Sequence, residues 1–272
     1  MARILHIETT GTSLLRNAAA LCENYNSLAK HCAKLDLWAK ADVDSTEDIE
    51  AGNNAVPGSL IFKGLLEALS SDPRRLSAEM NAFLSFLDTL KGPHEHMVFL
   101  LSSDTGSGWL CSKVIEDFLR SMERIPSTYV NGEHVIKMVE IRRVPMLGRD
   151  FSKGTLNLVA ETKKIITRFG PQVDEIAFNL TGGYKPETGF LLLTAGLLGA
   201  NRAYYIHETM RRVVEVPILP LSINEPVATV LKNIASGKYD ETGYRILREY
   251  RILRPWEKEP HWLRELANVL LE

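Results

Sequence analysis

The sequence has little cysteine and no excess of charge of either sign. Its 32 Lys and Arg residues against 34 Asp and Glu residues give a net charge of −2. No broad basic field therefore attracts long nucleic acid, and an anionic ligand would need a local cluster of donors and cations. The three cysteines, Cys22, Cys32 and Cys111, contain no CxxC pair. This pattern predicts reduced, buried thiols and argues against a structural zinc site, so we expect no metal.

Long hydrophobic runs are also missing. The longest, around residues 190–198, is interrupted by glycine and is too short to span a bilayer. The first residues enter a strand pattern at once and contain no signal-peptide core. We therefore expect a cytoplasmic protein that does not bind membranes.

The remaining pattern predicts an α/β fold. Hydrophobic residues make up 45% of the 272 residues, which is enough for a substantial core. Short apolar runs alternate with longer helical patterns, as in parallel strands joined by crossover helices. We expect a Rossmann-like, mostly parallel sheet with helices on both faces. Its strands are predicted at 3–8, 97–101, 135–141, 175–180, 203–207 and 212–216.

Two prolines, Pro217 and Pro220, follow the last predicted strand and suggest a domain boundary. Residues 1–220 would form the ligand-binding domain. Residues 221–272 would form a small helical C-terminal domain, for which a winged-helix form is one alternative. Its basic residues permit contact with DNA, but interspersed acidic residues dilute that signal, so DNA binding is not favoured.

Three predicted strands end in loops rich in glycine and hydroxyl residues, and each loop leads into a predicted helix. We call residues 10–13 (Thr-Gly-Thr-Ser) the first loop, residues 181–185 (Thr-Gly-Gly-Tyr-Lys) the second loop and residues 102–108 (Ser-Ser-Asp-Thr-Gly-Ser-Gly) the third loop. Ligands of open parallel sheets collect at the carboxyl ends of strands, where helix N-termini present free N–H groups. Helix capping alone explains the third loop equally well. It gives no reason for Lys185, which favours an anion at the second loop.

Neither standard phosphate motif is present. No Walker loop and no GxGxxG sequence follows a predicted strand, which argues against a P-loop ATPase and a dinucleotide oxidoreductase.

The ordered motifs resemble another family. The segments at 4–17, 77–81, 101–105 and 179–185 resemble those of the CRISPR-associated Rossmann-fold (CARF) family. The similar branch holds the CARF ribonucleases and the cyclic oligoadenylate ring nucleases of type III CRISPR systems. The resemblance spans roughly the first four-fifths of the chain. The Glu8-Thr9 pair departs from the small uncharged residues of many relatives, which leaves the ligand geometry open.

The resemblance implies a homodimer that binds cyclic oligoadenylate, most simply cyclic tetra-adenylate, across its two-fold axis. It also implies cleavage by metal-independent attack of a ribose 2′-OH, without a cofactor. Lys185 would stabilise the developing charge, and Ser13 or Thr12 would position the attacking hydroxyl. The implied ligand-binding residues are Thr10, Gly11, Asn17, Ser102, Ser103, Asp104, Thr105, Thr181, Gly182, Gly183 and Tyr184.

Two alternatives stay open at this stage. The protein could sense the ring without cutting it, or be a CARF ribonuclease that lacks its nuclease domain. Arg254 and His261 match the Arg-x4–6-His spacing of such nucleases, but the intervening Pro255 and Pro260 argue that this match is accidental. We favour a ring nuclease that switches off the signal, because no effector region is evident for a sensor to control.

Overall fold

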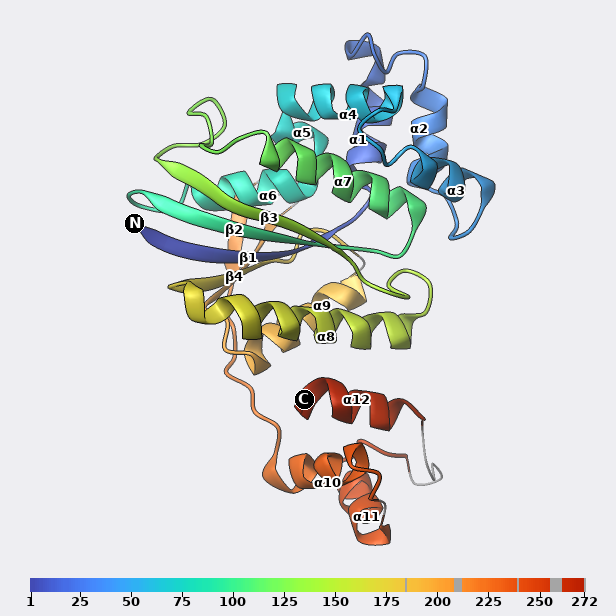
Figure 1. Cartoon of the computed structure of the whole chain (residues 1–272), viewed down its shortest axis with the longest axis vertical. Coiled ribbons are helices and arrows are strands. Elements are labelled where there is room, and N and C mark those ends of the chain that lie inside the picture. The colour runs from blue at the N-terminus through green and yellow to red at the C-terminus, as the bar shows by residue number, and fades with distance from the viewer. Residues whose placement is uncertain (184, 208–211, 239, 255–260, 272) are drawn as a thin grey trace.

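A computed structural model of the chain describes residues 1–183, 185–207, 212–238, 240–254 and 261–271. Its centre is one six-stranded sheet with the order β3-β2-β1-β4-β5-β6 (Figure 1). The first five strands are parallel and β6 is antiparallel to β5. The predicted Rossmann-like α/β fold is confirmed. The strands are β1 (Ala2–Thr10), β2 (His94–Ser102), β3 (His134–Arg143), β4 (Glu175–Asn179), β5 (Arg202–His207) and β6 (Arg212–Val216).

Helices cover both faces of the sheet (Figure 1). The larger layer lies on the upper face in that view and the smaller one below. The upper layer contains α1 (Ser13–Leu21), α2 (Cys32–Ala39), α3 (Thr46–Asn53), α4 (Leu60–Ser71), α5 (Pro73–Leu76), α6 (Ala78–Leu87) and α7 (Gly106–Arg120). The lower layer contains α8 (Phe151–Phe169) and α9 (Lys185–Leu197). Short 3-10 helices occupy Cys22–Asn24 and Gly170–Gln172.

The chain reverses its direction of strand addition beside β1. From β1 it moves to β2 and then β3 on one side, and it then crosses to β4 on the other side. The crossovers to β2 and β3 run above the sheet, while those to β4 and β5 run below it (Figure 1). The chain therefore leaves β1 toward one face of the sheet and leaves β4 toward the other. We call the sheet edge at the carboxyl ends of these two strands the crevice, because this is the usual ligand position in doubly wound folds.

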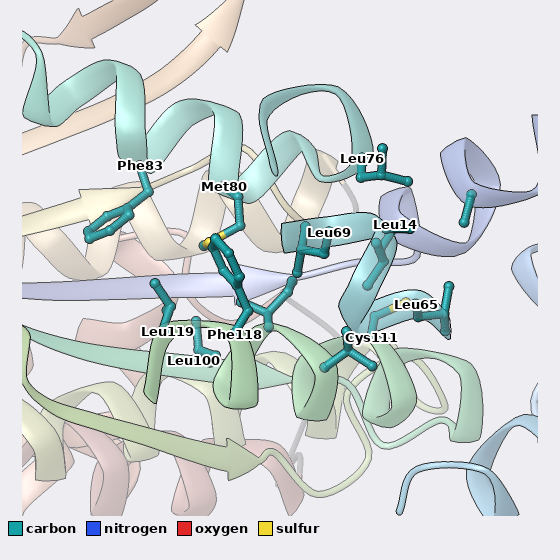
Figure 2. Close-up of a cluster of buried hydrophobic side chains, with 14 of the residues drawn as sticks. Leu14, Leu65, Leu69, Leu76, Met80, Phe83, Leu100, Cys111, Phe118 and Leu119 are labelled. Atoms are coloured by element: carbon teal, nitrogen blue, oxygen red, sulfur yellow. The ribbon is translucent and has the colours of Figure 1, made fainter. Parts of the chain in front are cut away.

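Apolar side chains fill the space between the sheet and each helix layer. Figure 2 shows the upper layer, where side chains of α4, α6 and α7 meet β2. The apolar side chains of α6 are buried in this layer: Met80, Phe83, Leu84 and Leu87. Ser77 begins this helix by accepting a hydrogen bond from the Met80 amide at 3.2 Å.

The C-terminal segment has an apolar cluster of its own, which extends from Val227 to Ala267. It is built from α10 (Glu225–Ala235), α11 (Glu241–Glu249) and α12 (His261–Leu271). Helix α12 packs against α8 of the lower layer. No strand occurs among the residues after Val216 that the structure describes, so a wing is not seen there. The boundary at residue 220 stays a prediction.

The expectation of three reduced cysteines is wrong for two of them. Cys22 and Cys32 form a disulfide with their Cα atoms 5.6 Å apart, so these two residues are not the free thiols predicted from their spacing. The pairing closes the segment between α1 and α2, which the sequence pattern did not reveal. Cys111 is a free, buried thiol, and burial raises its pKa to about 12. Over the described ranges, every helix is too short or too polar to cross a bilayer.

Candidate functional site at the crevice between β1 and β4

The first and second loops lie backbone against backbone. A Cβ on Gly11 would lie 3.2 Å from the Gly183 nitrogen, and a Cβ on Gly182 would lie 2.1 Å from the Thr9 carbonyl oxygen. Thr9 Oγ1 also donates a hydrogen bond to the Gly182 carbonyl at 2.7 Å. At Gly182 the Thr9 backbone leaves no room for a side chain, and at Gly11 a Cβ would make a tight contact with Gly183. The crevice therefore has a floor formed by both loops.

Two helices begin at this floor. Helix α1 starts at Ser13, and its N-cap residue Thr12 makes no side-chain capping bond. The Thr12 hydroxyl instead donates to the Ala39 carbonyl at 3.3 Å. Helix α9 starts at Lys185, the last residue of the second loop. Both N-termini carry partial positive charge, which suits an anion.

Two cations on these helices are exposed, Lys185 on α9 and Arg16 on α1. Neither pairs with a carboxylate in the parts of the chain that the structure describes. An unpaired cation at a helix N-terminus adds to the positive potential that a phosphate group would meet.

A buried carboxylate, Glu79 of α6, lies directly behind the floor and is 1% exposed. Its Oε1 accepts a hydrogen bond from the Gly11 amide at 2.9 Å. Its Oε2 accepts from the Ser13 hydroxyl at 2.6 Å and from the Ser77 hydroxyl at 2.7 Å. The hydroxyl protons of Ser13 and Thr12 thus point into the protein, so phosphate binding at this site would depend on backbone N–H groups and the cations.

A second buried acid, Glu8, lies on β1 beside Asn179 of β4. Asn179 Nδ2 donates to Glu8 Oε2 at 3.1 Å and to the Glu79 carbonyl at 3.1 Å, while its Oδ1 accepts from the Thr181 amide at 3.1 Å. Complete burial raises the pKa of Glu8 to about 8, with a smaller contribution from the charge of Glu79. Burial therefore favours the neutral form of Glu8, and Asn179 links both acids to the second loop.

The third loop uses its side chains internally. Thr105 caps α7 by accepting from the Gly108 amide at 3.1 Å, and it is hydrogen-bonded to Ser103 at 2.9 Å. Asp104 forms ion pairs with Arg143 at 2.9 Å and with Arg149 at 3.3 Å. Ser102 is buried, and its hydroxyl donates to the Ser103 carbonyl. These contacts are those of a capped helix with a neutralised acid.

The other predicted ligand residues lie around the two loops. Thr10 is buried and hydrogen-bonded to Ser112 of α7. Asn17 donates to the Leu76 carbonyl at 3.2 Å, which ties α1 to α5. Thr181 Oγ1 accepts from the Ile206 amide at 3.1 Å and so holds the second loop to β5. Tyr184 lies outside the described residues.

A chain of buried histidines crosses the sheet beneath this region. His6 Nε2 and His96 Nδ1 are 2.9 Å apart, and His96 Nε2 and His134 Nδ1 are 3.0 Å apart. The Tyr204 hydroxyl lies 3.3 Å from His6 Nδ1 at one end, and the Asn131 carbonyl lies 3.1 Å from His134 Nε2 at the other. Because a carbonyl can only accept, His134 must carry its proton on Nε2. Its Nδ1 then accepts from His96 Nε2–H, and His96 Nδ1 accepts from His6 Nε2–H in the same way. All three histidines therefore carry their proton on Nε2.

Sequence reasoning missed most of this buried polar layer. Burial lowers the pKa of His6 to about 3 and also lowers the pKa of His96. The position of His96 just before the predicted strand at 97–101 suggests a solvated loop residue, but His96 lies inside β2 and is completely buried. The only available signal was the position of these residues in apolar strand patterns. Among the residues described, no group of three or more potential ligand side chains is suited to a metal ion.

The strand order and the paired glycine loops define a doubly wound, Rossmann-like protein with a candidate site for an anionic ligand. A family model described as CRISPR-associated protein (Cas_APE2256) matches residues 74–219. The match covers more than half of the chain, and the protein belongs to this family. It includes Glu79 and the whole second loop, whereas the first loop lies before it.

Proposed function

We propose that the protein binds cyclic oligoadenylate, most simply cyclic tetra-adenylate, and cleaves it to switch off type III CRISPR signalling. The observation that carries this proposal is the meeting of the first and second loops at the crevice between β1 and β4. Membership of a CRISPR-associated family supports a defence role. The motif resemblance to the CARF branch of ring nucleases supplies the ligand class.

The groups at the crevice are suited to a phosphodiester. Backbone N–H groups at two helix N-termini and the exposed Lys185 favour negative charge. In the proposed reaction the ribose 2′-oxygen forms a bond to the adjacent phosphorus and the bond from phosphorus to the 5′-oxygen breaks. The proton of the 2′-OH passes to the departing 5′-oxygen through water. The products carry a 2′,3′-cyclic phosphate and a 5′-hydroxyl.

Catalysis would come from alignment and charge stabilisation. Lys185 is the proposed catalytic cation, since charge on the phosphoryl oxygens increases as the 2′-oxygen attacks. Ser13 or Thr12 would orient the attacking hydroxyl. This chemistry uses only the residues at the crevice and predicts slow turnover, which is sufficient to end a signal.

A homodimer would let two crevices share one symmetric ring. Helix α9, which begins at Lys185, exposes Phe190 and Leu193 at 41% and 52%. Phe151 at the start of α8 is 56% exposed, and its ring centre lies 6.1 Å from that of Phe190. These apolar side chains are exposed on the two helices of the lower layer, so a second copy placed there would bury them.

Incubation with cyclic tetra-adenylate and cyclic hexa-adenylate in EDTA tests the proposal. We expect linear products from the wild type and at least a hundredfold slower cleavage by Lys185→Ala, the loss typical of one electrostatic group. Lys63→Ala, which removes an exposed lysine of α4, is the matched control and should cleave normally. Tight binding without cleavage would favour the sensor alternative. Absence of binding to either ring would refute both.

A further inference from the structure

The direction of the hydrogen bond at Ser13 follows from its neighbours. Ser13 Oγ lies 2.6 Å from Glu79 Oε2, and it accepts a hydrogen bond from the Ala78 amide at 3.1 Å. A carboxylate has no proton to give, so the hydroxyl must be the donor to Glu79. One lone pair of Ser13 is taken by Ala78. Ser13 therefore keeps a single acceptor position and no free donor, and the residue is only half-buried.

Glu79 is held firmly as an acceptor. Three donors converge on its two oxygens: the Gly11 amide and the hydroxyls of Ser13 and Ser77. It also lies in the first turn of α6, where the helix N-terminus stabilises negative charge. Only a carboxylate accepts from three donors in this arrangement without presenting a proton of its own.

We propose that Glu79 is a positioning residue that makes Ser13 a hydrogen-bond acceptor toward the ligand, so that Ser13 selects a ribose 2′-hydroxyl. The inference rests on the proposed function and adds a specificity device to it. A hydroxyl whose proton is already committed cannot donate to a phosphate oxygen, but it can accept from a sugar hydroxyl. A 2′-deoxy ring would leave that acceptor without a partner in a partly desolvated site.

Glu79→Gln is the informative substitution because it keeps the size and removes the charge. An amide that accepts from the Gly11 N–H through its oxygen turns its NH2 group toward Ser13 and Ser77. Those hydroxyls then accept from the amide, and the proton of Ser13 is released toward the crevice. The variant thus changes the direction of the bond while keeping its partners in place.

The test measures the binding of cyclic tetra-adenylate and of its 2′-deoxy counterpart to the full chain. We expect the wild type to prefer the ribose ring by about tenfold or more. Ser13→Ala and Glu79→Gln should each reduce that preference at least severalfold. Glu116→Gln is the control, since Glu116 is a buried carboxylate of α7 with ion pairs to Lys113 and Arg120. It should retain the full preference. Thermal unfolding of each variant establishes that it is folded, and if Glu79→Gln fails to fold, Ser13→Ala carries the test.

The outcomes distinguish a failure of the proposed function from a failure of the inference about Glu79 and Ser13. If the wild type binds neither ring, the proposed function fails and this inference fails with it. If the wild type binds the ribose ring but binds the deoxy ring equally well, only the inference is wrong. An unchanged preference in either Ser13→Ala or folded Glu79→Gln would also overturn it, whether or not the ring is cleaved.

Discussion

Thr9 and Gly182, which are 173 positions apart in the chain, are joined by a 2.7 Å hydrogen bond from the Thr9 hydroxyl to the Gly182 carbonyl. This contact fixes the end of β1, just before the first loop, against the second loop at the point where the strand order reverses. The proposed ligand site depends on it, because neither loop alone presents both helix N-termini.

A side chain at residue 182 should disrupt this contact. The Cβ of Gly182→Ala would lie 2.1 Å from the Thr9 carbonyl oxygen, which is backbone and cannot rotate away. We expect a loss of about 2 kcal/mol or more in the free energy of unfolding, measured in urea. Gly189→Ala is the control, because a Cβ there meets nothing within 4 Å. It should be neutral or stabilise α9 by up to about 1 kcal/mol. Equal stability of the two variants would contradict the packing described.

Glu8 should make stability depend on pH. Its pKa is raised from 4.5 to about 8 on folding, so the folded protein keeps a proton that the unfolded chain loses. The stabilisation is complete below pH 4.5 and is lost as pH rises toward 8, with a slope approaching about 1.4 kcal/mol per pH unit. Glu8→Gln should flatten this part of the unfolding profile. Glu23→Gln, at an exposed residue, should leave the slope in place.

The buried histidines should make the free energy of unfolding depend on pH in the opposite direction, so that it decreases at acid pH. Burial lowers the pKa of His6 to about 3, and it also lowers the pKa values of His96 and His134. As pH decreases, the histidines of the unfolded chain therefore bind protons at a higher pH than those of the folded protein. Stability should be fully present above about pH 6.5 and should fall as pH drops toward 3. A profile that stays flat from pH 6.5 to 4 in Glu8→Gln would be inconsistent with neutral histidines.

Replacing His96, the central member of the buried histidine chain, should lower the free energy of unfolding. His96→Leu leaves a donor on His6 and an acceptor on His134 without partners in a buried layer. We expect a loss of about 2–4 kcal/mol in the free energy of unfolding at pH 7.5. His94→Gln is the matched control, since His94 is only partly buried and contacts the Gly92 carbonyl. A change below 0.5 kcal/mol (roughly the error of such measurements) in His96→Leu would show that the chain is not formed.

The disulfide should contribute measurably to stability. Cys22 and Cys32 are 10 positions apart, and closing a loop of that size removes roughly 3 kcal/mol of unfolded-chain entropy. Dithiothreitol should lower the midpoint of urea unfolding for the wild type. A variant with both cysteines replaced by serine should not respond to the reductant. Cys111→Ser should keep the wild-type response, since Cys111 is free.

Much of the fold could be predicted because its signals are local. The apolar run at 97–101 is confined to one strand, and it is confirmed as part of β2. The glycine-rich turns were also visible in the chain. The Cys22–Cys32 pair was not, because spacing alone does not say whether two Cα atoms come within bonding range.

The sequence by itself determined the α/β class, the six strands and the loops rich in glycine, since strand and helix periodicity and turn propensity act over short segments. Only the tertiary structure decided that β4 lies beside β1, which brings Gly11 to Gly183. It also decided that the Ser13 hydroxyl donates its hydrogen bond to Glu79 and that burial raises the pKa of Glu8. These properties depend on which distant groups share a water-poor layer, and that is set by the packing of helices on the sheet.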